Sequence, residues 1–182
     1  MRAILMTFVL LSASAAATPH APAESGLDAL FAQLHKAGSS DDAKPIEKII
    51  LTHFLQSGSA SVDLLMSHAD TLLGASDPGT AVKILDAVTQ IAPGYAEGWH
   101  QRGKLEMQAG HDEAAMVSLQ KAVNLNPREF EALVELGDML AQYGAKPAAL
   151  ASYKKALALD PHFEGLDRRV EQLSRDVEGE KI

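Results

Sequence analysis

The sequence contains no cysteine and only 5% aromatic residues, and both shortages limit what the chain can be. Without cysteine it has no disulfide, no thiolate for a metal ion and no thiol for lipoprotein attachment. The alternation of β-branched and aromatic residues that a sheet requires is nearly absent. Because the apolar residues are mostly alanine and leucine, which favour helices, the composition predicts an all-α fold.

Positive charge is also scarce, with 16 Lys and Arg against 24 Asp and Glu, a formal net charge of -8. Such a chain repels phosphate backbones, and the sequence contains no basic patch with interleaved aromatic residues. We therefore expect no nucleic-acid partner. With 182 residues, the chain is long enough for one domain with a core and too short for two comfortable ones.

Motifs that carry catalysis are missing as well. The sequence contains no H-E-x-x-H, no G-x-S-x-G and no glycine-rich phosphate loop. Its seven histidines are scattered, and His100, with Glu97 one helical turn away, has no second histidine at a ligand spacing. We therefore expect no catalytic residue, no metal site and no cofactor.

Residues 1–17 have the pattern of a secretory signal. Arg2 gives a positive start, Ala3 to Leu11 form an apolar stretch, and Ala15 to Ala17 fit the small-residue rule for cleavage. The apolar stretch is shorter than the roughly 20 residues that span a bilayer. The expected location of the mature chain is therefore outside the cytosol, in the bacterial periplasm.

The strongest pattern is a repeat of 34 residues. Pro93, Pro127 and Pro161 each end an apolar helical run, and other residue types recur at the same step. Small residues, which allow two helices to approach closely, recur in two columns, and large apolar residues that would fill the core recur in two more. The small columns are Ala69, Gly103, Gly137 and Ala81, Ala115, Ala149; the large ones are Leu65, Trp99, Leu133 and Leu85, Leu119, Tyr153.

These columns resemble the tetratricopeptide repeat (TPR) family, in which helical hairpins stack into an α-solenoid with a concave groove. The resemblance implies three repeats, at 62–95, 96–129 and 130–163. The second repeat departs from the pattern, because Arg102 and Glu106 replace the leucines found in the third repeat. Being four residues apart on one helix, these two residues are expected to pair.

The flanks are expected to be helical too. Residues 18–61 are predicted to hold a linker and a helical pair, the first helix capped by Ser25 and the second starting at Asp41 and Asp42. We expect this pair to cover the first repeat, because repeat stacks need polar-faced ends. In residues 164–182, an apolar stripe continuing from Phe163 predicts a C-terminal capping helix and tail.

The resemblance also implies a binding groove, lined by the first helix of each repeat. The residues expected there are acidic around an apolar middle, which suits a neutral or basic protein segment and argues against the acidic chaperone tails that some family members hold. They are Asp63, Met66, Asp70 and Leu73; Glu97, His100, Lys104 and Met107; and Glu131, Val134, Asp138 and Ala141.

The leading hypothesis is thus a non-catalytic scaffold or adaptor in the cell envelope that binds a protein or peptide. One alternative is a self-assembling structural envelope protein, a homo-oligomer joined through its terminal helices, such as the Phe163 to Val177 stripe. Another is a hydrolase acting through carboxylate pairs such as Asp63 and Asp70. A fourth interpretation treats the acidic stripe as an ordinary solvated face.

Overall fold

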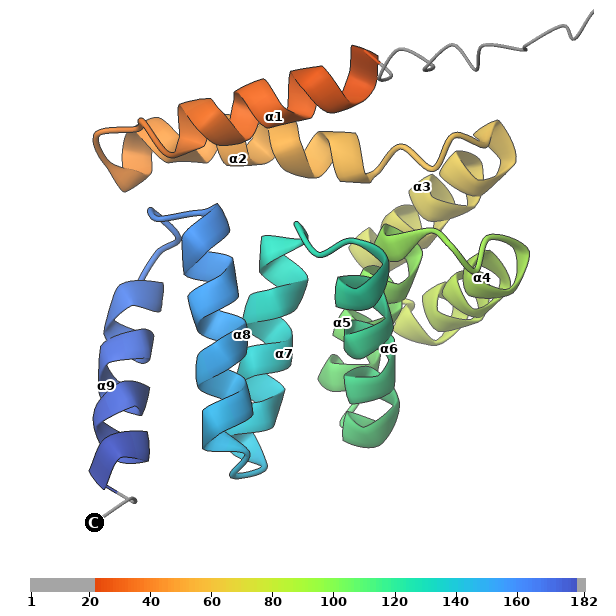
Figure 1. Ribbon diagram of the computed structural model, residues 1–182. Helices are drawn as coiled ribbons and strands as arrows, with labels where there is room; N and C mark the ends of the chain where they lie inside the picture. The colour runs from red at the N-terminus through yellow and green to blue at the C-terminus, as the bar shows by residue number, and fades with distance from the viewer. Residues whose placement is uncertain (1–21, 180–182) are drawn as a thin grey trace, which may run out of the picture.

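The computed structural model describes residues 22–179, and in that range every regular element is a helix (Figure 1). This confirms the predicted all-α fold. The proposed signal, residues 1–17, lies outside the described residues. None of the described helices is long and apolar enough to cross a membrane. The helices are α1 (Pro22–Leu34), α2 (Ser40–Phe54), α3 (Ala60–Gly74), α4 (Pro78–Ile91), α5 (Ala96–Gln108), α6 (Asp112–Leu125), α7 (Phe130–Gln142), α8 (Lys146–Leu159) and α9 (Leu166–Gly179).

Three antiparallel hairpins, α3–α4, α5–α6 and α7–α8, form the repeat stack. Glycine is required where the paired helices approach. A Cβ atom on Gly103 would lie 2.9 Å from Leu119 Cγ, and one on Gly137 would lie 2.5 Å from the Tyr153 ring. The small-residue columns therefore mark the contacts within each hairpin, as the sequence predicts.

The turn inside each hairpin depends on one residue in the left-handed backbone region. Gly110 and Gly144 take this role in the second and third hairpins, with φ of 73° and 76°. In the first hairpin Ser76 has a φ of 60°, a conformation that costs a non-glycine residue free energy. Asp77 follows it and caps α4, because its side chain accepts a hydrogen bond from Thr80 N at 3.1 Å.

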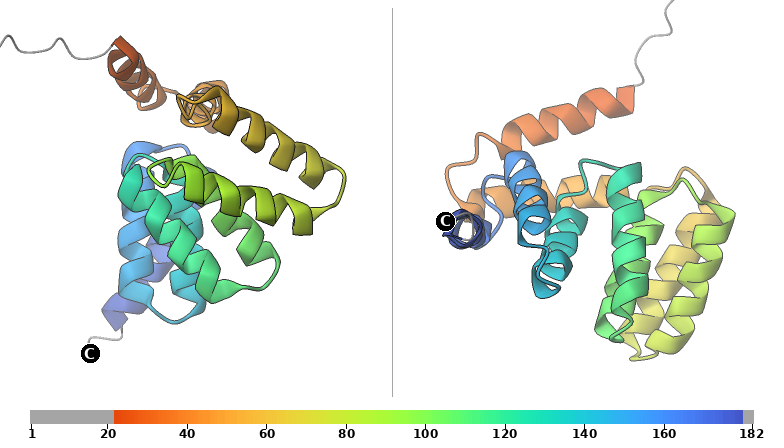
Figure 2. Two further views of the ribbon diagram at one scale, coloured as in Figure 1. Left: turned by 90° about the vertical axis from the view of Figure 1, so that its right-hand side faces the viewer. Right: turned by 60° about the horizontal axis from the view of Figure 1, so that its bottom comes forward.

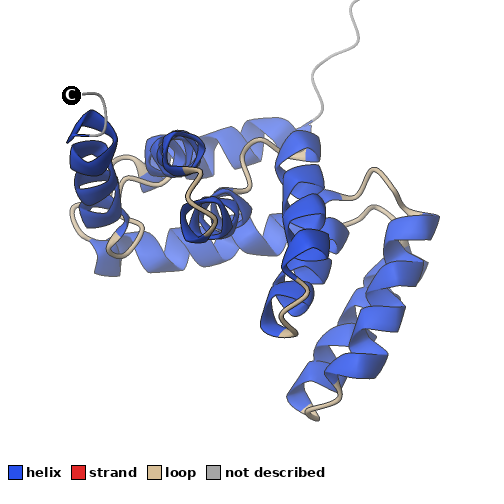
Figure 3. Ribbon diagram, turned by 90° about the horizontal axis from the view of Figure 1, so that it is seen from below, coloured by secondary structure: helices blue, strands red, loops and turns tan. Residues whose placement is uncertain are grey.

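The apolar core is divided into two clusters. The larger joins α1 and α2 to α6, α7, α8 and α9, while the smaller belongs to α3 and α4 with one residue of α5. Figure 3 shows the α3–α4 hairpin leaning away from the other helices. The smaller cluster consists of Val62, Met66, Ala69, Ala81, Leu85, Val88 and Leu105.

Polar side chains help to connect the first repeat to the second. The predicted pair is confirmed, because Arg102 Nη2 lies 2.8 Å from Glu106 Oε1. Arg102 Nε also reaches Asp86 Oδ1 on α4 at 2.7 Å, and Ser118 Oγ on α6 donates to Glu106 Oε2 at 2.6 Å. This group, called the Arg102 network, ties α4, α5 and α6 together.

The helical pair α1–α2 does not cover the first repeat, so that prediction is wrong. The pair lies across one end of the third repeat, where Phe31 meets Phe130 edge to face with ring centroids 6.4 Å apart (Figures 1 and 2). Arg128 Nη1 pairs with Asp28 Oδ1 at 2.6 Å. The apolar faces of α1 and α2 pack here because α7 and α9 expose complementary apolar side chains at this end.

A smaller correction concerns the start of α1. The helix begins at Pro22, so Ser25 lies inside it and is not the residue that precedes it. Proline suits the first turn of a helix because its fixed φ is already helical and its missing N–H would have no partner there.

The C-terminal helix α9 packs against α8 and caps the third repeat, as predicted. Leu166 and Leu173 are buried against the larger core, and the Phe163 ring lies edge to face with Phe130, centroids 6.1 Å apart. Val170 and Val177 pack on the same core. The stripe proposed for self-assembly therefore packs against the chain's own core, with Leu166 and Leu173 buried and the other members half-buried.

Candidate functional site

The first part of the predicted stripe lines an accessible hollow. On α3, four predicted residues line a cavity of about 420 Å³ bounded by α4, α5 and the residue that follows α2. We call this cavity the α3 hollow. Its lining residues are Leu55, Asp63, Met66, Ser67, Ala69, Asp70, Leu73, Leu85 and Gln101.

The α3 hollow combines an apolar floor with carboxylates. Met66 and Leu85 are buried within it, and Asp70 is exposed. Asp63 accepts hydrogen bonds from Ser57 Oγ at 2.6 Å and from Ser57 N at 2.9 Å, and these bonds lower its pKa. A general acid needs a raised pKa, so Asp63 is not suited to the role of general acid.

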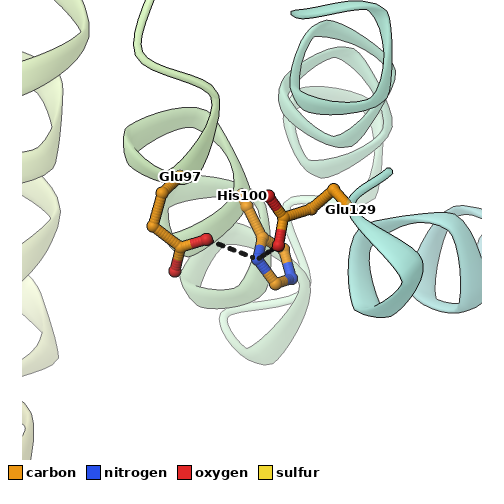
Figure 4. Close-up of side chains that lie close together, drawn as sticks. All are labelled: Glu97, His100 and Glu129. Carbon is orange, nitrogen blue, oxygen red and sulfur yellow. Dashed lines mark hydrogen bonds and ion pairs between the residues drawn. The ribbon is translucent and has the colours of Figure 1, made fainter. Parts of the chain in front are cut away.

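The first two stripe residues of the second repeat are buried and not open to a partner. Glu97 and His100, one turn apart on α5, are both buried, and His100 has no exposed surface. His100 Nδ1 lies 3.3 Å from Glu97 Oε2 and 3.8 Å from Glu129 Oε1, while Nε2 lies 3.0 Å from Glu135 Oε2 (Figure 4 draws the first three residues). We call Glu97, His100, Glu129 and Glu135 the Glu–His cluster.

Two members of the Glu–His cluster come from the next repeat. Glu129 immediately precedes α7, and Glu135 lies in its second turn. Neither could be predicted from the sequence, because Glu129 is 32 residues away from Glu97, Glu135 is 35 residues away from His100, and the four share no motif. Only the stacking of α7 beside α5 brings the four side chains together.

The electrostatic environment of the Glu–His cluster raises the pKa of two of its members. Burial, followed by the negative charge of Glu97, raises the pKa of Glu129 to about 8. Burial lowers the pKa of His100, but hydrogen bonds and charges from Glu135 and Glu97 outweigh burial and raise it to about 10. Three carboxylates around one imidazole therefore leave a local excess of negative charge that binds protons tightly.

The rest of the stripe is only partly available to a partner. Val134 is buried, and Asp138 already accepts hydrogen bonds from Tyr153 at 2.6 Å and Arg169 at 2.9 Å. Lys104, Met107, Glu131, Leu73 and Ala141 are half-buried. Of the predicted groove residues, Met66, Glu97, His100 and Val134 are buried.

A larger hollow, of about 680 Å³, lies on another surface between α6 and α7. Trp99, Met116, Leu136, Leu140 and Tyr143 give it an apolar lining. None of the predicted groove residues lines it, so the stripe and this hollow are separate features of the molecule.

Comparisons with known proteins identify the repeat. A family model described as a tetratricopeptide repeat matches residues 96–129, the segment that contains α5 and α6. A TPR repeat-containing protein from Rhizobium etli is 33% identical over 115 residues, covering 63% of this chain and 56% of that protein. The chain thus spans little more than half the length of this relative.

Solved structures share the fold at low sequence identity. The type III secretion chaperone SycD of Yersinia enterocolitica, in complex with a peptide of the translocator YopD, has a TM-score of 0.58 at 19% identity, over 68% of this chain and 97% of that chain. The first TPR of Spaghetti (RPAP3), bound to an HSP90 peptide, has a TM-score of 0.59 at 15% identity, over 64% and 92%. The 34-residue columns, the stacked hairpins and the family model that matches residues 96–129 show that the chain contains tetratricopeptide repeats.

Proposed function

We propose that this protein is a non-catalytic scaffold that binds a protein or peptide, and that the α3 hollow is the main point of contact. The observation that carries the proposal is the hollow itself, an accessible cavity of about 420 Å³ with an apolar floor and two aspartates, on the first helix of a repeat. A concave cavity with a few placed polar groups is the usual form of a binding site.

The similar structures support this class of function. SycD is in complex with a YopD peptide, and the RPAP3 repeat is bound to an HSP90 peptide. Both share the helical stack with this chain. Because a repeat scaffold serves many partners, this likeness supports binding of a protein segment and does not identify it.

The chemistry of the α3 hollow indicates what the partner segment contains. One apolar side chain buried on Met66 and Leu73 would contribute about 1.5–3 kcal/mol of binding free energy. A Lys or Arg near the exposed Asp70 would contribute about 0–1 kcal/mol. The apolar anchor therefore supplies most of the affinity, and the acids favour neutral or basic segments over acidic ones.

Peptide binding tests this function. We expect a fluorescent amphipathic peptide with Lys and Leu to bind the full chain more tightly than the same peptide with Glu in place of Lys, measured by anisotropy. Asp70→Lys should weaken the basic peptide about threefold to tenfold, because it replaces an attraction with a repulsion. Glu171→Lys, an equal charge change at an exposed position of α9, is the control and should leave affinity unchanged. Equal affinity for both peptides would count against the proposal.

We also propose that the scaffold works in the cell envelope. The support is the signal-like pattern of residues 1–17. Cell fractionation of the full chain, beside a chain that lacks these residues, tests the location. Recovery of both chains in the cytosolic fraction would contradict it.

A further inference from the structure

The Glu–His cluster has the composition and geometry of a metal site. We propose that Glu97, His100 and Glu129 bind a divalent transition-metal ion, with Zn²⁺ as the best match, at the junction of the second and third repeats. One imidazole nitrogen and two carboxylate oxygens are ligands that Zn²⁺ accepts, and three protein ligands leave one position for water. The proposal does not depend on peptide binding at the α3 hollow.

The donor atoms are already close to the required spacing. One donor atom from each of the three residues lies within 4.8 Å of the other two. In a tetrahedral zinc site with bonds of about 2.1 Å, neighbouring donors lie about 3.4 Å apart. The distances from His100 Nδ1, 3.3 Å to Glu97 and 3.8 Å to Glu129, bracket this value (Figure 4).

Neighbouring groups orient each of the three ligands. His100 Nε2 faces Glu135 Oε2 at 3.0 Å. This carboxylate would keep the proton on Nε2 when a metal ion displaces the proton on Nδ1. Gln101 Nε2 donates to Glu97 Oε1 at 2.6 Å, and Asn126 Nδ2 donates to Glu129 Oε2 at 3.0 Å. Each ligand carboxylate thus has one oxygen fixed by an amide and the other aimed at the imidazole.

The second oxygen of Glu129 gives independent support. The Glu129 side chain has no exposed surface, and its Oε1 atom has no hydrogen-bond partner among the residues the structure describes. A buried carboxylate oxygen without a partner carries a large desolvation cost. This oxygen lies 3.8 Å from His100 Nδ1, so a cation between them would offset that cost.

An ion can approach the cluster from the side of α2. A hollow of about 500 Å³ is lined by Glu97 and Glu129 together with polar residues from the end of α2 and from the loops between repeats. His53 and Gln56 lie in the same lining. The bound ion would join α5 to the residue that opens α7, and so fix the second repeat against the third.

Calorimetric titration of the full chain with Zn²⁺ tests the site. We expect one ion per chain, and at least tenfold weaker binding in Glu129→Gln and in His100→Gln, because each removes a ligand. Glu135→Gln should weaken binding about tenfold to hundredfold, because it disturbs the orientation of His100. Glu113→Gln and His111→Gln, at exposed positions of α6 and its start, are matched controls and should bind as the unmodified chain does.

A second readout separates metal binding from a purely structural role. In nitrogen-detected NMR of the imidazoles, zinc should shift His100 Nδ1 while Nε2 stays protonated. The variant Glu129→Gln has the shape of the original side chain, so it decides the question even if His100→Gln fails to fold. Absence of a one-to-one event in the unmodified chain, or equal affinity in Glu129→Gln, would overturn the proposal.

Discussion

The first and third repeats follow the same 34-residue pattern but have different surroundings. The third repeat lies within the larger core and is covered by α1, α2 and α9. The first has a small core of its own and is held to the second through Leu105 and the Arg102 network. A repeat pattern therefore sets the fold of a hairpin, whereas the helices that pack against the hairpin decide which of its surfaces stay exposed.

The difference has a functional consequence. The α3 hollow belongs to the less covered repeat, where Leu64 and Ile91 are also strongly exposed. The corresponding face of the third repeat is occupied, since Asp138 is bound by Tyr153 and Arg169. Regions with fewer buried contacts open more readily, which suits a surface that accommodates a partner.

The largest expected effect comes from the core of the third repeat. Phe130→Ala should reduce the free energy of unfolding by about 4 kcal/mol, because Phe130 is fully buried between Phe31 and Phe163. Leu85→Ala, in the smaller core, should cost about 3 kcal/mol. Urea unfolding measures both values. Amide exchange in α1 and α2 should rise only for Phe130→Ala. Equal exchange in both variants would contradict the division into two cores.

The Arg102 network gives the next effect. Arg102→Leu should cost about 3 kcal/mol, because the buried Glu106 loses its charged partner and keeps only the hydrogen bond from Ser118. The double variant Arg102→Leu, Glu106→Leu copies Leu136 and Leu140 of the third repeat and should recover most of that loss. Thermal or urea unfolding measures the cycle. A double variant as unstable as the single one would show that the bond from Arg102 to Asp86 on α4, and not the pairing with Glu106, carries the stabilisation.

Two glycines, one packed in the third hairpin and one exposed at the end of α3, differ in their tolerance of a larger side chain. Gly137→Ala should cost about 1–3 kcal/mol, because the new Cβ would lie 2.5 Å from the Tyr153 ring. Gly74→Ala, at the end of α3, meets no atom within 4 Å and should be neutral or stabilise the helix by up to about 1 kcal/mol. Urea unfolding should show a loss of stability for Gly137→Ala alone, and an equal loss for Gly74→Ala would contradict this account of the packing.

The smallest effect concerns the contact between α2 and the third repeat. Burial, followed by the charge of Asp160, raises the pKa of Glu47 to about 7. The folded state therefore binds this proton more tightly than the unfolded chain does, and its stabilising effect is complete below about pH 4.5 and is lost as the pH rises through 7.

The size of that effect is below about 1 kcal/mol after solvent screening, because Glu47 is only partly buried. Glu47→Gln should flatten this part of the pH dependence, measured as urea midpoints at pH 5 and pH 8. Glu113→Gln, exposed on α6, is the control and should keep the slope of the unmodified chain. An unchanged slope in Glu47→Gln would assign the dependence to other groups.

Much of the fold could be predicted because its determinants are local or periodic. The prolines at a spacing of 34, the glycines opposite Leu119 and Tyr153, and the apolar stripe of α9 each require particular residues at particular positions. The pair of Arg102 and Glu106 could also be predicted, since four residues make one helical turn. The placement of α1 and α2 could not be predicted, because hydrophobic burial is non-directional and an apolar helix face can pack against any other apolar face.

The candidate sites were also predictable only in part from the sequence. Helical spacing alone aligns Asp63, Met66 and Asp70 on α3, and the structure brings them to one hollow. The same spacing puts Glu97 and His100 together but says nothing of their burial. The helices, their hairpins and the residues on each helix face follow from the sequence alone. Which faces are covered, and the contact between Glu129 and His100, follow only from the packing of separate helices in space.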